Sequence, residues 1–275
     1  MKKTLSAFKP TLGAVIINYR TPEDSIRCAE SLIRYKIASS TKDIVIVNNP
    51  SGDDSTEIIK QRLPQITVVN APTNGGFGSG VNIGVERCAR EFIAVLNPDT
   101  VFFDNSLSEV FRQFKDPKVG IVGFNLVNED GSPQHSARTF YSFATVILRR
   151  TPLKKLSYFK KLEDDHLLKN RELDKSTFEA PWVLGAGFVV RRSAFVKLGG
   201  MDERFFLYLE DTDICRRMWR AGYKVCVAAS AKLMHVHRRE SANSTFSNSN
   251  KEHLKSLVYY ISKYGLPIFG HDRYK

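Results

Sequence analysis

The first hundred residues alternate short apolar runs with segments in which apolar residues recur every three or four positions. The apolar runs are 12–18, 43–47, 66–70 and 92–96, and the periodic segments are 22–35, a stretch through 58–63, and 79–90. A short apolar run bounded by turn residues is typical of a strand covered on both faces, and the 3.6-residue period is typical of an amphipathic helix. Because four predicted strands alternate with three predicted helices, we predict an α/β protein with a mostly parallel central sheet and helices on both faces.

The second half has a less regular pattern. It predicts a helix near 107–114, a strand at 119–124, a hairpin-like turn at 128–131, a strand pattern over 180–190 and a strand at 223–228. Gly185 and Gly187 interrupt the 180–190 pattern, which indicates a bulge or a close approach by a ligand. From residue 253 onward, apolar residues at helical spacing predict a tail that packs back on the domain or on a membrane.

Polar residues follow each of the first four predicted strands. They are Asn18, Tyr19 and Arg20, then Asn48 and Asn49, then Asn74, Gly75 and Gly76, and finally Asn97 and Asp99. Ligands of parallel α/β sheets bind at the carboxyl ends of the strands, so we expect these residues to meet in one crevice. Amide side chains can bond to a base edge and glycines let the backbone approach a phosphate, which favours a nucleotide. A G-x-G-x-x-x-G pattern at 78–84 follows the third strand rather than the first, so it is not interpreted as a dinucleotide fingerprint.

Three acids, Glu210, Asp211 and Asp213, stand between an apolar run at 205–209 and a periodic segment that should end at Gly222. They are therefore predicted at a helix start, where the macrodipole favours negative charge. Asp211 or Asp213 could simply cap the helix. A half-buried carboxylate pair is also suited to general-base catalysis, because desolvation raises its pKa toward neutral pH.

The formal net charge of +12 over 275 residues narrows the partners to nucleic acid, an anionic membrane surface or phosphorylated small molecules. Signatures of nucleic-acid modules are absent, so no nucleic acid is expected. Much of the excess charge lies between Arg149 and Lys175, where basic pairs alternate with leucine and aromatic residues. This basic segment suits an anionic membrane surface, and an ordinary solvated helix face is the alternative.

Residues 1–10 lack the apolar region of a signal peptide, and no apolar run reaches the 18 residues of a membrane span. The four cysteines, Cys28, Cys88, Cys215 and Cys226, form no C-x-x-C pair and lie inside predicted elements. They are expected to be reduced core thiols of a cytosolic protein.

Seven short motifs follow one another between residues 13 and 241. They are V-I-I-N-Y-R, I-V-N-N-P-S, N-G-G-F-G-S-G-V-N-I-G, L-N-P-D, W-V-L-G-A-G-F, G-G-M-D-E-R-F-F and L-E-D-T-D-I-C-R-R. In this order they resemble the family 2 glycosyltransferases, particularly bacterial rhamnosyltransferases of O-antigen and cell-wall polysaccharide assembly. The resemblance implies a GT-A fold, in which one α/β domain binds a sugar nucleotide and Mg²⁺ or Mn²⁺ and inverts the anomeric configuration in a single displacement.

Matched residue by residue, the resemblance makes Asp211 the general base and places Glu210 beside the acceptor. It places Asp99 on the metal and His235 where relatives have a histidine that helps hold the metal or the diphosphate. By strand alternation His237 would share the face of His235, so it is the alternative histidine. The implied nucleotide-sugar site comprises Asn18, Tyr19, Arg20, Asn48, Asn49, Gly75, Gly76, Asn82, Asn97 and Asp99, and the implied acceptor site comprises Trp182, Gly185 and Glu210. Alternatives remain at single positions. Asp99 could simply start a turn, Trp182 could be a core residue without a role in binding, and His235 could be an ordinary core or surface histidine.

The resemblance also divides the chain and suggests substrates. Residues 1–245 would form the transferase domain, with a nucleotide half at about 11–100, an acceptor half at about 101–245 and the basic insert at about 145–175; residues 246–275 would form the helical tail. The rhamnosyl branch favours dTDP-L-rhamnose as donor and a lipid-linked saccharide as acceptor at the cytoplasmic face of the membrane. Asn97 replaces the first acid of the family's D-x-D element, which would otherwise contact the ribose or a second metal. Asn48 stands where many relatives have Asp, so the contact to the base can differ, and a UDP-sugar is an alternative donor.

Three other functions compete. A non-catalytic sugar-nucleotide-binding relative would bind without turnover, which the Glu210–Asp211 pair argues against. A nucleotidyltransferase would need a basic, glycine-rich phosphate loop after the first strand, where the chain has Asn18-Tyr19-Arg20. A nucleic-acid binder rests only on the net charge.

Overall fold

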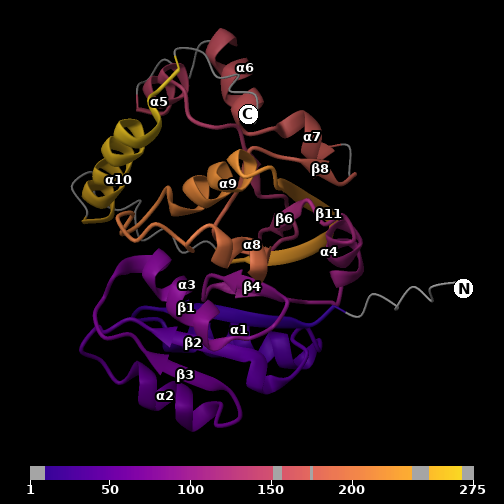
Figure 1. The fold of residues 1–275 in the computed structure, drawn as a ribbon, viewed down its shortest axis with the longest axis vertical. Coiled ribbons are helices and arrows are strands. Elements are labelled where there is room, and N and C mark those ends of the chain that lie inside the picture. Colours follow the sequence, from indigo (N-terminus) through magenta and orange to yellow (C-terminus); the bar gives the residue numbers. More distant parts are fainter. Residues whose placement is uncertain (1–9, 151–156, 174–175, 237–247, 268–275) are drawn as a thin grey trace, which may run out of the picture.

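The computed structural model describes residues 10–150, 157–173, 176–236 and 248–267. Within these residues a mixed sheet of nine strands runs through the molecule, in the order β3-β2-β1-β4-β10-β6-β11-β5 with β8 paired to β11, and helices lie on both of its faces (Figure 1). A second sheet of two strands joins β7 to β9. The predicted α/β class is confirmed.

The first half matches the sequence pattern closely. Its strands are β1 (Leu12–Asn18), β2 (Ile44–Asn48), β3 (Thr67–Asn70) and β4 (Phe92–Leu96), and its helices are α1 (Pro22–Arg34), α2 (Ser55–Arg62) and α3 (Gly76–Arg87). All pairings among the four strands are parallel, as predicted. Alternate residues of β1 face opposite layers, because Ile16 packs in the core that contains α1 and Val15 in the core that contains α3.

Glycines allow α3 to lie close against β1. A Cβ on Gly84 would come 2.2 Å from Val15 Cγ1, so this position has no room for a side chain. Gly80 and Gly84 therefore serve helix-to-strand packing, since a Cβ on Gly80 would lie 3.0 Å from Ile17 Cγ2 of β1.

The second half adds short strands and most of the helices. These are β5 (Thr100–Val101), α4 (Leu107–Phe114), β6 (Val119–Val127), β7 (Ala137–Arg138), α5 (Phe143–Arg150), α6 (Ser157–His166), α7 (Lys169–Leu173), β8 (Phe178–Glu179), β9 (Trp182–Val183), β10 (Gly187–Arg191), α8 (Arg192–Lys197), α9 (Glu210–Arg220), β11 (Lys224–His235) and α10 (Asn248–Tyr264). β10 runs antiparallel to both β4 and β6, which makes the sheet mixed.

Two strand predictions are wrong in detail. The 180–190 pattern is divided between β9 in the small sheet and β10 in the large one, because Leu184 N–H donates to Ser136 O and Gly185 N–H donates to the Asp211 side chain instead of to a neighbouring strand. The 223–228 strand continues to His235, since a shift of register between Ala228 and Lys232 lets β11 pair with β6 beyond the weakly apolar stretch.

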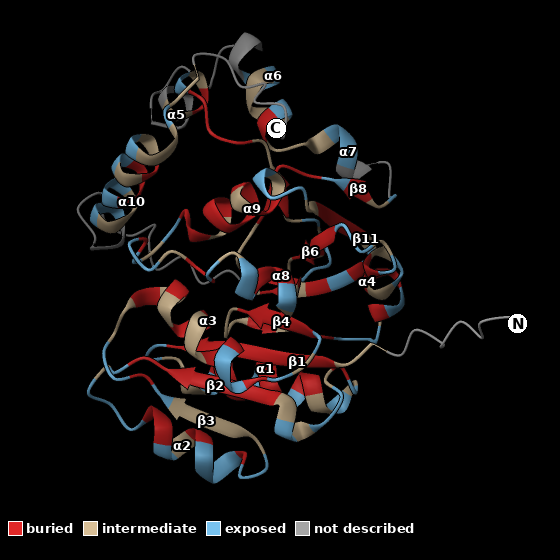
Figure 2. Cartoon of the chain, in the orientation of Figure 1, coloured by how far each residue is buried: buried red, intermediate tan, exposed pale blue. Residues whose placement is uncertain are grey.

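The remaining expectations concern the cysteines, the basic segment and the tail. All four cysteines are free and buried. The basic segment forms parts of α5, α6 and α7, but residues 151–156 and 174–175 lie outside the described residues. α10 packs back on the domain through Leu257 and Tyr260, which are buried while the opposite face of the helix is exposed (Figure 2). No helix in the described part of the chain is both long enough and apolar enough to cross a membrane.

Candidate active site

The two predicted catalytic regions meet at one edge of the large sheet. Asp99 follows the carboxyl end of β4, and Asn97 N–H donates to Ala186 O at 2.9 Å. The adjacent Gly185 N–H donates to Asp211 Oδ2 at 2.8 Å. Because Gly187 of β10 pairs with Leu96 of β4, these contacts place Asp99 and Asp211 at neighbouring strand ends.

A strained turn leads into the acidic helix. Tyr208 and Leu209 have φ values of 68° and 69°, in the left-handed region that non-glycine residues seldom adopt. Leu209 occupies the N-cap position of α9, so Glu210 and Asp211 lie in its first turn and neither acid is the cap. The macrodipole of α9 therefore favours negative charge at this pair.

Asp211 has several groups that stabilise its charged form. Its carboxylate accepts hydrogen bonds from the N–H groups of Gly185 and Thr212, at 2.8 and 2.7 Å. Burial raises the pKa of Asp211, whereas these hydrogen bonds and the positive charge of Arg138 oppose the rise.

Glu210 has an opposite environment. Its side chain is buried, and its Oε2 atom has no hydrogen-bond partner in the described part of the chain. Burial, and then the negative charge of Asp211, raise the pKa of Glu210 well above its usual value. Of the two acids, Asp211 is therefore the one whose charged form is stabilised by hydrogen bonds, whereas the Oε2 atom of Glu210 has none within the described residues.

Asp99 lies beside His235 at the predicted metal position. His235 Nε2 is 3.4 Å from Asp99 Oδ1, and β5 and β11 pair Thr100 with His235. Gln134 Nε2 donates to His235 O at 2.7 Å, so Gln134 Oε1, 2.8 Å from His235 Nδ1, is the acceptor for that ring nitrogen. When the imidazole is neutral, its Nε2 lone pair therefore faces the Asp99 carboxylate.

A cation fits this arrangement, because a carboxylate oxygen and a neutral imidazole nitrogen that face each other can both bind it. A carboxylate oxygen and an imidazole nitrogen are suitable ligands for Mn²⁺, and a carboxylate suits Mg²⁺. The described residues contain no group of three His, Cys, Asp or Glu side chains placed to hold a metal ion. A metal bound by Asp99 and His235 would therefore need further oxygen ligands from the substrate or water. His237, the alternative ligand, lies outside the described residues.

Two asparagines predicted to contact the nucleotide are tied into the sheet. Asn18 Nδ2 donates to Asn48 Oδ1 at 2.6 Å, and Asn48 Nδ2 donates to Thr56 Oγ1 at 2.8 Å. Asn18 is fully buried and Asn48 is 7% exposed, so these amides hold strand ends together and offer little surface to a ligand. Tyr19 and Arg20, the next residues along, are both exposed, with the guanidinium of Arg20 5.5 Å from the Tyr19 ring centre.

The third polar strand end meets the turn that precedes the acids. Asn49 Nδ2 donates to Gly76 O at 3.2 Å, and the buried Asn49 Oδ1 has no hydrogen-bond partner in the described part of the chain. Gly75 is the N-cap of α3. Gly76 has a φ of 85°, and a Cβ there would lie 1.9 Å from Phe206 O. The glycine pair thus lets the nucleotide half contact the segment that carries Glu210 and Asp211.

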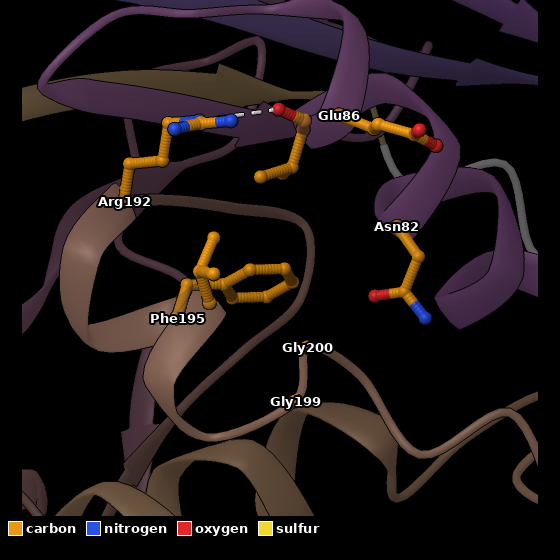
Figure 3. A pocket seen from close by; sticks show the side chains of 8 residues that line it. Asn82, Glu86, Arg192, Phe195, Gly199 and Gly200 are labelled. Atoms are coloured by element: carbon orange, nitrogen blue, oxygen red, sulfur yellow. Dashed lines mark hydrogen bonds between the residues drawn. The ribbon is translucent and has the colours of Figure 1, made fainter.

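Asn82 lies apart from these residues. Its amide donates to Met201 O and Glu203 Oε1 and accepts from Met201 N–H, which fixes the loop before α9. Asn82 also lines a cavity of about 360 Å³ between α3 and α8, together with Glu86, Arg192 and Phe195 (Figure 3). The residues lining this cavity include neither acid of the predicted site.

On the acceptor side, Trp182 is a core residue. Its side chain is 2% exposed, its Nε1 donates to Thr139 O at 2.8 Å, and the Tyr141 ring stacks on it. The structure therefore places Trp182 in the core, which was the alternative to an acceptor-binding role. Arg138, which sequence reasoning missed, lies 5.3 Å from the Trp182 ring centre and stabilises the charge of Asp211. The pairing of β7 with β9 brings Arg138 next to Trp182 and so into the neighbourhood of Asp211. The sequence does not indicate this contact, because Arg138 and Asp211 are far apart along the chain.

Solved structures with this architecture define the class of fold. A crystal structure of GalNAc-T7 with UDP, GalNAc and Mn²⁺ superposes with a TM-score of 0.66 at 17% identity, covering 98% of this chain and 53% of that chain. The mannosyltransferase PcManGT from Pyrobaculum calidifontis, in complex with GDP-Man and Mn²⁺, gives 0.62 at 13% identity, covering 94% and 64%. This chain thus spans between half and two-thirds of each neighbour and has the GT-A glycosyltransferase fold.

The chain belongs to the glycosyltransferase-like family 2, whose sequence model matches residues 10–254. It is 25% identical over 232 residues to an N-acetylglucosaminyl-diphospho-decaprenol L-rhamnosyltransferase of Mycobacterium tuberculosis, covering 80% of this chain and 74% of the relative. It is also 24% identical over 203 residues to rhamnosyltransferase WbbL of Escherichia coli K12, with coverage of 68% and 70%. The resemblance seen in the seven motifs is confirmed.

Proposed function

We propose that this protein is an inverting, metal-dependent glycosyltransferase that moves L-rhamnose from dTDP-L-rhamnose to a lipid-linked saccharide. The observation that carries the proposal is the pairing of a hydrogen-bonded Asp211 with a buried Glu210, whose Oε2 atom has no hydrogen-bond partner among the described residues. This pair lies near the end of β4, where Asp99 and His235 also lie. The Asp211 carboxylate is suited to take a proton, and the side chains of Asp99 and His235 are suited to hold a cation.

In the proposed reaction, Asp211 takes the proton of the acceptor hydroxyl as its oxygen forms a bond to the anomeric carbon. The bond between that carbon and the nucleotide diphosphate breaks in the same step, with inversion. A divalent cation held by Asp99 and His235 would neutralise charge on the departing diphosphate. In this proposal Glu210 carries a proton beside Asp211, which keeps a second negative charge away from the base.

The relatives support the choice of sugar and acceptor. Two carry rhamnosyltransferase activity in their names, and one of these names specifies a diphospho-decaprenol-linked sugar as acceptor. The solved neighbours hold UDP or GDP-Man with Mn²⁺, so a UDP-sugar remains the alternative donor and Mn²⁺ or Mg²⁺ the proposed cofactor.

A lipid-linked acceptor requires access to the membrane. Lys160 and Lys161 of α6 are exposed, and α10 exposes Leu254 and Val258 beside lysines. Apolar residues flanked by lysines favour binding to an anionic lipid surface. We therefore propose peripheral binding at the cytoplasmic face of the membrane through these helices.

Purified protein incubated with dTDP-, UDP- and GDP-sugars and Mn²⁺ or Mg²⁺ provides the test. Thermal stabilisation by one nucleotide sugar identifies the donor, because a ligand that binds only the native state raises its stability. Transfer to a polyprenyl-diphosphate saccharide, with an inverted linkage by NMR, would support the proposal. Donor binding without transfer to any lipid-linked saccharide would instead support a non-catalytic relative.

A further inference from the structure

The C-terminal helix α10 contacts the segment 202–213, which carries the acid pair. Ser256 Oγ donates to Leu207 O at 2.8 Å, and the rings of Tyr259 and Phe205 lie 4.8 Å apart. The helix thus reaches the main chain just before the strained turn at Tyr208 and Leu209.

Lys263 of α10 joins the two ends of this segment. Its ammonium lies 2.6 Å from Asp202 Oδ2 and also pairs with Asp213 Oδ1. Asp213 is fully buried and lies two residues after Asp211 on the same helix. A single cation therefore holds both the start of the segment and the first turn of α9.

The buried charge of Asp213 depends on its partners. Arg217 Nε lies 2.7 Å from Asp213 Oδ2, and the Tyr264 hydroxyl donates to Oδ1 at 2.6 Å. Removing one partner of a buried ion pair leaves a charge that is poorly compensated. Without Lys263, Asp213 would keep one cation, Arg217, among the contacts described here.

The turn between the two ends requires such support. Left-handed φ values at two successive non-glycine residues cost free energy and persist only where the surroundings enforce them. The Ser256 bond to Leu207 lies on one side of the turn and the Lys263 bridge spans both sides. The backbone of Glu210 and Asp211 follows directly from this turn.

We propose that Lys263 is a positioning residue for the reaction: by bridging Asp202 and Asp213, it fixes segment 202–213 and thereby the place of the Asp211 carboxylate. The inference rests on the proposed transferase function. α10 is then part of the catalytic architecture, although none of its residues has been assigned to the site.

Loss of the Lys263 charge should also alter the titration of the acid pair. The negative charge of Asp213 contributes to the raised pKa of Glu210, so a poorly compensated Asp213 raises that pKa further. Several titratable or charged groups interact with the two acids or with Asp213. They are Arg138 on β7, Cys215 and Arg217 on α9, Tyr259, Tyr260, Lys263 and Tyr264 on α10, and Arg204 before α9, with Asp202 reached through Lys263. Two cations pair with Asp213 in the described part of the chain: Arg217, which lies on the same helix, and Lys263, which lies on α10.

The test compares Lys263→Met with Lys255→Met. Lys255 lies on the same helix but is 72% exposed and pairs with Glu252, so it controls for the loss of one lysine. Hydrogen exchange should show lost protection within 202–213 in Lys263→Met and none in Lys255→Met. In Lys263→Met, kcat should fall roughly tenfold or more with donor KM nearly unchanged, because small misplacements of catalytic groups have large effects on rate. The limb of its pH profile that reports loss of the Glu210 proton should move to higher pH.

Two further variants keep the outcome decisive if Lys263→Met does not fold. Lys263→Arg preserves a cation that can bridge two carboxylates and should restore most of kcat. Asp202→Asn removes one end of the bridge and should reduce protection in the same segment. Unchanged exchange in 202–213, or unchanged kcat and pH profile in an active enzyme, overturns the inference. If the wild type shows no transfer, the proposed function fails, and the exchange data still decide whether Lys263 fixes the segment.

Discussion

The main-chain N–H of Gly185 donates a hydrogen bond of 2.8 Å to the Asp211 carboxylate. This bond joins the break between β9 and β10 to the first turn of α9, and Asn97 bonds to the residue next to Gly185. These two bonds link distant parts of the chain at the end of the sheet where β4 terminates. A general base and a metal ligand that act on one substrate must lie close together in this way.

Replacing Asp211 by Asn should remove the base while keeping most of the local packing. General-base catalysis typically contributes about 10²–10⁴-fold to rate, so kcat should fall by that order with little change in donor affinity. Steady-state kinetics and donor titration by calorimetry measure the two effects. Asp104→Asn, at an exposed position, is the matched control and should leave kcat unchanged. A folded Asp211→Asn enzyme with the parent rate would show that Asp211 is not the base.

Replacing Glu210 by Gln should stabilise the protein in a pH-dependent manner. Because the pKa of Glu210 is raised in the folded state, the wild type loses stability as pH rises above the unfolded value of about 4.5. The neutral glutamine avoids this loss, so the melting temperature of Glu210→Gln should exceed that of the wild type at pH 7 by roughly 2–4 °C for each kcal/mol gained.

The pH series provides the control for Glu210→Gln. Below pH 4.5 both proteins carry a neutral group at this position, so their melting temperatures should converge. A difference that is the same at pH 4 and pH 8 would contradict a raised pKa for Glu210.

The first half of the fold was predictable because its signals are local. Continuous apolar runs such as 12–18 identify covered strands, and the period of α1 follows from its apolar residues. The break at Leu184 to Ala186 was not predictable as a change of sheet, because its cause is hydrogen bonding to Ser136 and Asp211, far away in sequence.

The motifs placed Asp211 and Asp99 in one predicted site, and the structure brings them to the same end of the sheet. Whether an asparagine contacts a ligand or a neighbouring strand depends on the direction of its side chain, which the motifs do not give. Asn18 and Asn82 bond to protein groups that sequence alone could not identify. Arg138 and Lys263 reach the acids only through tertiary contacts, so no sequence pattern indicated them.

Replacing Gln134 by Leu should weaken metal binding. Gln134 Oε1 accepts from His235 Nδ1 and so presents the other ring nitrogen to Asp99, and loss of such outer partners typically costs about 10–100-fold in metal affinity. Titration of Mn²⁺ in the presence of the nucleotide diphosphate measures this effect without turnover. Gln61→Leu, at an exposed position on α2, should leave the affinity unchanged. Equal Mn²⁺ affinity in both variants would remove Gln134 from the proposed metal site.

Replacing Gly76 by Ala should destabilise the contact between the two halves. Gly131→Ala is a matched control, since its φ of 79° is close to the 85° of Gly76 but no atom lies within 4 Å of a Cβ built there. Both variants incur the left-handed strain of about 1–2 kcal/mol per residue, and only Gly76→Ala adds a clash with Phe206 O. Urea unfolding should therefore show a clearly larger loss of stability for Gly76→Ala. Equal losses would mean that the backbone at the start of α3 can shift enough to remove the clash with Phe206 O.

Replacing Leu254 and Val258 together by Ser should reduce membrane binding. These side chains are 48% and 60% exposed on one face of α10, and burying them in lipid would gain roughly 25 cal/mol per Å² of apolar surface. Co-sedimentation with vesicles containing anionic lipid should show weaker binding by the double variant, and 1 M salt should weaken binding of the wild type by screening the lysines. Val196→Ser, at an exposed apolar position on α8, should bind as the wild type does. Because all three substitutions remove exposed apolar surface, equal binding by the two variant proteins would show that α10 is not the lipid-binding face.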